Sequence, residues 1–90
     1  MRLAKRLHVE GRVQGVGYRV QVRGIAESLG VRGWVRNLPD GSVEVVAEGT
    51  AEQLERFVTR IETDVRLARV RRIHTTAIEP VGFTSFDITG

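Results

Sequence analysis

The sequence predicts an α+β fold in which two helices cover one face of an antiparallel sheet of four to five strands. Two observations predict it. Apolar and polar residues alternate with a period of two in several short stretches, and apolar residues recur with the helical period in two longer ones. These stretches follow one another in the order β-α-β-β-α-β. Both helices can bury their apolar stripes on so small a sheet only from the same face, so we expect a ferredoxin-like sandwich in a single domain of residues 1–90.

The chain begins with a predicted strand and a predicted helix. Residues 6–10 alternate around Leu7 and Val9, as in a strand with one buried face. Beyond Arg19, apolar residues follow the i, i+3, i+4, i+7 pattern of an amphipathic helix, and Gly30 suits its C-terminal end. This apolar stripe consists of Val22, Ile25, Ala26 and Leu29.

A hairpin follows the first helix. Residues 31–38 and 42–48 read as two strands, and Pro39-Asp40-Gly41 between them is a turn sequence. Asn37 falls on the same, mostly apolar side of its strand as Val35. A polar amide at the end of such a row needs a partner, which makes Asn37 a candidate functional residue.

The second half of the chain contains the clearest helix. Thr50 and Gln53 form a capping-box sequence, and an apolar stripe follows them. In the next strand the alternation slips by one residue at Arg71-Arg72, which predicts a β-bulge. Residues 83–88 are expected to close the chain as a short last strand.

Composition excludes several classes of protein. Hydrophobic residues make up 41% of the chain, and no apolar run is long enough for a membrane span, so we expect a protein that does not bind membranes. The basic residues 1–6 lead directly into alternating residues and not into a long apolar region, which is not typical of a cleavable signal peptide, so we expect a cytoplasmic protein. The absence of cysteine rules out thiolate catalysis and disulfides. A net charge of +3, with Lys5 as the only lysine, permits an anionic ligand. The arginine cluster at residues 66–72 is interpreted first as a solvated face.

The stretch G-R-V-Q-G-V-G-Y-R, residues 11–19, is the leading candidate for a binding site. It has three glycines, two arginines and no acidic residue, and it leads into the N-terminus of the first helix. Loop N–H groups, the helix dipole and Arg19 together are a suitable site for an anion such as phosphate. The stretch lacks the Gly-Lys-Ser/Thr ending of a Walker A loop, and the alternative is a flexible strand-to-helix turn.

Other constellations are weaker candidates. His8 and His74 lie on strands that could be neighbours, but without an organised third ligand two histidines predict surface residues and not a metal site. The serines, Ser28, Ser42 and Ser85, have no base pattern near them, so a serine nucleophile is not expected.

Two segments resemble the signature sequences of the acylphosphatase family. They are residues 11–19 and the stretch G-W-V-R-N-L-P-D-G-S-V-E-V-V-A-E-G at residues 33–49. The resemblance extends over nearly the whole chain and includes the closing Phe86-x-Ile88. It implies the ferredoxin-like fold and hydrolysis of acyl phosphates to a carboxylate and inorganic phosphate, without a metal, a cofactor or a covalent phosphoenzyme.

The resemblance also implies roles for individual residues. Arg19 matches the phosphate-binding arginine, and Asn37 matches the asparagine that positions the attacking water. The backbone cradle corresponds to Gln14, Gly15, Val16, Gly17 and Tyr18. We expect phosphate or the substrate carboxyl to take the proton of the water, because neither motif contains a histidine or carboxylate suited to the task. A monomer that also binds phosphate and sulfate is expected.

Two alternatives belong to other functional classes. A nucleic-acid-binding module of the same topology would need stacking aromatic residues on its first and third strands, and residues 6–10 and 42–48 contain none. A non-catalytic anion-sensing domain would not need Asn37, since binding alone requires no water-positioning amide.

Overall fold

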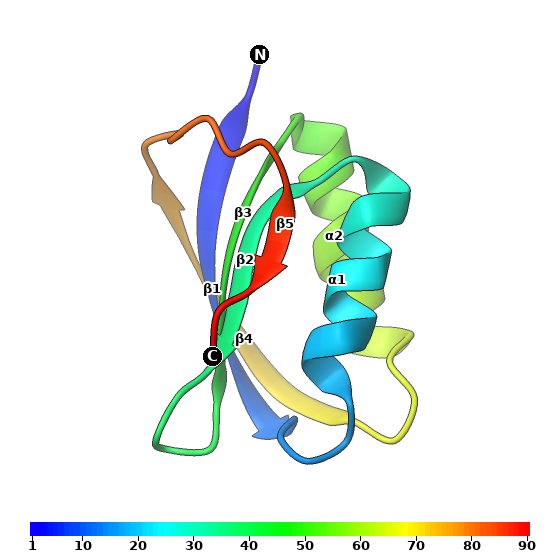
Figure 1. Ribbon diagram of the computed structural model, residues 1–90. Helices are drawn as coiled ribbons and strands as arrows, with labels where there is room; N and C mark the ends of the chain where they lie inside the picture. The colour runs from blue at the N-terminus through cyan, green and yellow to red at the C-terminus, as the bar shows by residue number, and fades with distance from the viewer.

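The chain folds into two layers, a five-stranded sheet and a pair of helices that cover one of its faces (Figure 1). The computed structural model describes residues 1–90. None of the helices is long and apolar enough to cross a membrane. The predicted element order is confirmed, including the short last strand: β1 Leu3–Arg12, α1 Tyr18–Leu29, β2 Arg32–Asn37, β3 Val43–Gly49, α2 Ala51–Thr63, β4 Arg69–Ile78 and β5 Phe86–Ile88.

The strand order across the sheet is β4-β1-β3-β2-β5. β1 pairs antiparallel with β3 and β4, and β2 pairs antiparallel with β3. β5 pairs with β2 in parallel, so the prediction of a wholly antiparallel sheet was wrong for this strand. The reason is that the chain crosses the end of the sheet after β4 and enters β5 from the same end as β2.

The core lies between the sheet and the helices. Leu7 and Val9 of β1 are fully buried on the helix-facing side, as their alternation predicted, and Val45 of β3 is fully buried in the same cluster. Phe57 of α2 is fully buried against them in the same cluster. Burial of each such side chain stabilises the fold by about 1.5–3 kcal/mol. The opposite face of the sheet carries no helix and is called the open face below.

Two local predictions are confirmed. Thr50 accepts the Gln53 N–H while the Gln53 side chain accepts the Thr50 N–H, which completes the capping box of α2. In the β1–β4 ladder, Glu10 faces Arg72 and Gly11 faces Val70, so Arg71 is the extra residue of a bulge. A Cβ atom on Gly11 would lie 2.1 Å from the Arg69 carbonyl oxygen, so only glycine fits beside this bulge.

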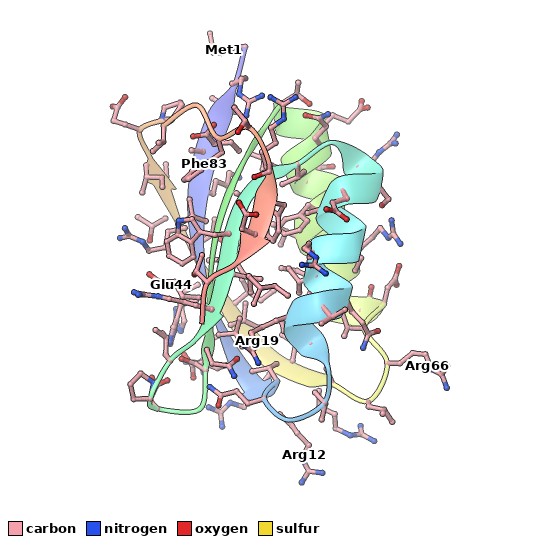
Figure 2. All side chains as sticks on the ribbon, viewed as in Figure 1. Met1, Arg12, Arg19, Glu44, Arg66 and Phe83 are labelled. Carbon is pink, nitrogen blue, oxygen red and sulfur yellow. The ribbon has the colours of Figure 1, made fainter.

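A buried carboxylate holds the crossing segment between β4 and β5. Glu48 is fully buried, and its side chain accepts hydrogen bonds from the N–H groups of Val81, Gly82 and Phe83 and from Arg2. Burial of the carboxyl favours its neutral form, but these donors outweigh it and lower the pKa of Glu48. Figure 2 shows Phe83 near the end of the sheet opposite Arg19, so this feature lies away from the predicted anion site.

Candidate active site

The loop of residues 13–17 joins β1 to α1, and two of its glycines have left-handed backbone conformations. Gly15 and Gly17 have φ values of 73° and 74°, which other residues rarely adopt. No atom lies within 4 Å of the position of a Cβ on Gly15. The loop therefore needs glycine there for backbone conformation and not for lack of space. Left-handed residues in such a loop help to turn its N–H groups toward a common point.

Seven consecutive backbone N–H groups, those of residues 14–20, donate no hydrogen bond within the protein. The first main-chain bond of α1 runs from the Gln21 N–H to the Gly17 carbonyl oxygen at 3.2 Å. Gly17 is the N-cap of α1, and no side chain caps the helix. These free donors and the positive end of the helix dipole create a local preference for an anion.

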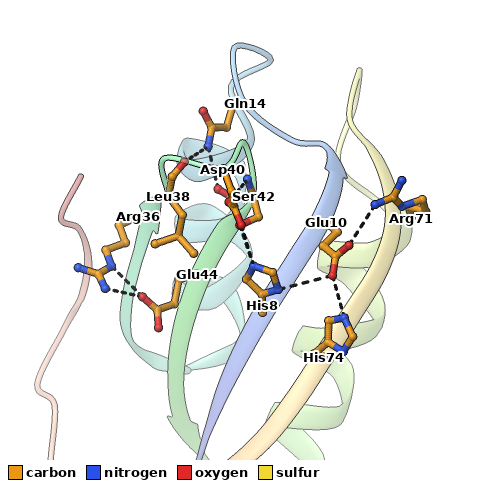
Figure 3. A network of polar contacts seen from close by, with 10 residues as sticks. All are labelled: His8, Glu10, Gln14, Arg36, Leu38, Asp40, Ser42, Glu44, Arg71 and His74. Atoms are coloured by element: carbon orange, nitrogen blue, oxygen red, sulfur yellow. Dashed lines mark hydrogen bonds and ion pairs between the residues drawn. The ribbon is translucent and has the colours of Figure 1, made fainter.

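Two side chains anchor this loop to the rest of the fold. Gln14 donates from Nε2 to the carbonyl oxygens of Leu38 and Ser42, both at 2.8 Å, and so ties the loop to the β2–β3 hairpin (Figure 3). Tyr18 is buried, and its hydroxyl donates to the Ile61 carbonyl oxygen at 2.8 Å. Burial, with a smaller effect of a nearby glutamate, raises the pKa of Tyr18, so its hydroxyl stays protonated. Both residues can contribute only their backbone N–H groups to an anion.

Arg19 lies in the first turn of α1 and is partly exposed. One guanidinium nitrogen donates to the main-chain oxygen of Gly90. Figure 2 shows Arg19 between the start of α1 and the end of the chain that Figure 1 marks C. A guanidinium has five N–H donors, so this single bond positions Arg19 while the other donors remain open to a ligand.

Asn37 ends β2 beside Arg19. Its backbone N–H donates to the same Gly90 oxygen at 3.1 Å, so donors from α1 and β2 converge on one atom. The Oδ1 atom of Asn37 is buried and is the only buried side-chain polar atom without a hydrogen-bond partner. An unpaired buried acceptor is unfavourable for folding, so Oδ1 is available to a donor on a bound molecule. The partner that the sequence pattern required is therefore absent from the protein itself.

The structure thus brings together Arg19, Asn37 and the free N–H groups of residues 14–18. Gly90 is a member of this cluster that the sequence did not predict, since no local pattern links it to a residue 71 positions earlier. None of these residues lines the polar cavity of about 380 Å³ that opens elsewhere, on the open face beside the hairpin. The cluster and this cavity are therefore separate places on the protein.

Comparison of the sequence and the fold with known proteins identifies a family. The sequence model of the family described as acylphosphatase matches residues 5–88. The acylphosphatase of Thermococcus kodakarensis is 45% identical over 89 residues, which are 99% of this chain and 98% of that protein. The acylphosphatase of Thermus thermophilus is 48% identical over 80 residues, covering 89% and 91%. The crystal structure of acylphosphatase from Bacillus subtilis is 37% identical, with a TM-score of 0.93 and coverage of 98% and 99%.

Proposed function

This chain belongs to the acylphosphatase family, and from that premise we propose that Arg19, Asn37 and the N–H groups of residues 14–18 carry out its reaction. The reaction is the hydrolysis of acyl phosphates to a carboxylate and inorganic phosphate. The observation that carries the assignment is the buried Oδ1 of Asn37, which lacks a partner next to a cluster of free donors.

The phosphoryl group is held by the loop and by Arg19. Phosphoryl transfer proceeds through a loose transition state with charge spread over three equatorial oxygens, so catalysis depends mainly on positioned donors. The free N–H groups of residues 14–18 and the open guanidinium donors of Arg19 are the donors available here. Phosphate and sulfate, which offer the same tetrahedral oxygens, bind at the same place.

Asn37 positions the water. Its Oδ1 accepts one O–H of the water and aims the oxygen at phosphorus from the side opposite the acyl oxygen. The P–O bond to the acyl group breaks as the new P–O bond forms, and the carboxylate leaves with the bonding electrons. An amide cannot accept the proton, so the proton of the water passes to a phosphoryl oxygen, giving inorganic phosphate.

We take the enzyme to be a monomer, because Arg19, Asn37 and the loop of residues 14–18 form the proposed site within one chain. Its location in the cytoplasm stays an expectation from the sequence. Light scattering on the purified protein is the direct measurement of its mass in solution. A dimer that dissociates only with loss of activity would contradict this part of the proposal.

The test is hydrolysis of acetyl phosphate in the presence of a chelator, followed across pH. We expect full activity with the metal removed and a kcat that shows no essential group titrating near the usual histidine pKa of about 6.5. Loss of activity on chelation would contradict the proposed water activation. A bell-shaped profile with a histidine-like limb would instead show that a base takes the proton.

A further inference from the structure

Three potential metal ligands meet on the open face, outside the proposed active site. His8 of β1 and His74 of β4 are direct partners across the antiparallel ladder, and their ring centroids are 5.8 Å apart. Glu10 lies two residues beyond His8 on β1, so the period of the strand places it on the same face. The register thus supplies the third donor that the sequence alone could not place.

The donor atoms of these side chains converge at metal-binding distances. Glu10 Oε2 lies 2.8 Å from His74 Nε2 and 3.7 Å from His8 Nδ1, and all three ligand atoms lie within 4.8 Å of one another. With metal bonds of about 2.0–2.1 Å, two ligands of a tetrahedral ion are roughly 3.4 Å apart. Small side-chain rotations would bring the three atoms onto one ion.

His8 is oriented for this role by the hairpin (Figure 3). Its Nε2 lies 2.8 Å from the hydroxyl oxygen of the buried Ser42, and that hydroxyl donates to Asp40. Because the Ser42 proton goes to Asp40, Ser42 accepts the Nε2–H of His8, so in the neutral ring it is Nδ1 that is free to bind a metal, and Nδ1 faces the Glu10 carboxylate. A fixed hydrogen bond on the second ring nitrogen is the usual support of a metal-ligating histidine.

The remaining contacts are compatible with a cation. Arg71 binds Oε1 of Glu10 at 3.0 Å, so Oε2 stays available on the other side of the carboxylate. The polar cavity described above adjoins the cluster, and none of its lining residues is hydrophobic, so there is room for water to complete the coordination. The positive charge of Arg71 opposes a divalent ion, so it lowers the affinity that the three donors alone would give.

We propose that His8, Glu10 and His74 form a binding site for a first-row divalent cation, with Zn²⁺ as the best-matched ion. Two imidazoles and one carboxylate are donors that Zn²⁺ accepts with open positions left for water. Binding displaces the Nε2 proton of His74, which now donates to Glu10, and shifts that ring to its Nδ1–H form. The ion links β1 to the edge strand β4, so it stabilises the fold and takes no part in the hydrolysis.

The experiment is calorimetric titration of the metal-free protein with Zn²⁺ at neutral pH. We expect one ion per chain, and we expect His74→Gln and Glu10→Gln each to weaken binding by about tenfold or more. In parallel, the imidazole NMR signals of His8 and His74 should shift together as Zn²⁺ is added. Absence of saturable binding at millimolar Zn²⁺, or binding that His74→Gln leaves unchanged, would overturn the proposal.

Glu44→Gln is the matched control. Glu44 is the β3 partner of His8 on the same face and contacts Arg6 and Arg36, but it lies outside the cluster. Its replacement should leave Zn²⁺ affinity unchanged, and equal weakening by Glu44→Gln would show that general surface charge and not coordination holds the ion. Hydrolysis of acetyl phosphate with chelator present confirms that each variant is folded.

Discussion

The guanidinium of Arg19 and the main-chain oxygen of Gly90 are hydrogen-bonded across 71 positions of sequence, and the Asn37 N–H donates to the same oxygen. This oxygen joins the start of α1 to the end of β2. Arg19 and Asn37, the two residues proposed for catalysis, are therefore both held by the Gly90 oxygen. Their relative positions depend on it as much as on the elements that carry them.

Ending the chain at Thr89 tests that relationship. Without the Gly90 oxygen, Arg19 loses the bond that orients it, so KM for acetyl phosphate should rise by roughly tenfold, the scale of one lost hydrogen bond. The remaining main-chain bond from Thr89 to Val35 keeps β5 in place. Steady-state kinetics measure the change, and tighter binding would show that Gly90 competes with the substrate for Arg19.

Arg19→Gln should weaken phosphate binding and turnover together. A charge-assisted hydrogen bond contributes about 1.5–3 kcal/mol, so inhibition by inorganic phosphate should weaken by roughly 10- to 100-fold. Arg12→Gln is the control, because Arg12 is exposed and makes no hydrogen bond to another side chain. Equal losses in the two variants would reduce the role of Arg19 to general electrostatic attraction.

Asn37→Ala should separate binding from catalysis. We expect kcat to fall by about 100- to 1000-fold, the scale of one lost preorganised group, while the inhibition constant of phosphate stays unchanged. The free energy of unfolding should not decrease, because Oδ1 makes no hydrogen bond that the substitution could break. Chemical denaturation and inhibition kinetics provide the two readouts. A parallel loss of phosphate affinity would contradict the assigned role.

Gly17 and Gly24 make a matched pair within one short segment. Gly17 has φ of 74°, so alanine there costs about 1–2 kcal/mol and disturbs the free N–H groups of the loop. Gly24 lies inside α1 with open space around it, so Gly24→Ala should stabilise the protein by about 1 kcal/mol without changing activity. Thermal unfolding of both variants checks this, and similar effects of the two substitutions would argue against a conformational requirement at Gly17.

Glu48→Gln should destabilise the protein by about 1–3 kcal/mol at neutral pH, because an amide cannot accept all the donors around it. The folded-state pKa of Glu48 lies below its usual value of 4.5, so its ionised form stabilises the fold above that pH. This contribution is lost as pH falls through the folded pKa. The difference between parent and variant should therefore shrink below about pH 4.5 in denaturation measured across pH. A stability difference between parent and variant that stays constant with pH would contradict a stabilising role of the ionised Glu48 side chain.

Much of the fold could be predicted because its signals are local. Period-two alternation placed Leu7 and Val9 in the core, and the capping-box sequence placed the start of α2 at Thr50. The slip in alternation placed the bulge of β4 at Arg71. The signature segments indicated the family and its reaction. Each of these features is set by residues within one or two turns of chain, where side-chain periodicity and backbone preference act directly.

The contacts between segments that are distant in the sequence were decided by the tertiary structure alone. The parallel entry of β5, the Gly90 oxygen between Arg19 and Asn37, and the burial of Glu48 under residues 81–83 depend on how the chain crosses the sheet after β4. The meeting of His8 with His74 depends on the register of β1 against β4. A shift of one residue in that register would turn one ring to the other face, and no local pattern in the sequence specifies it.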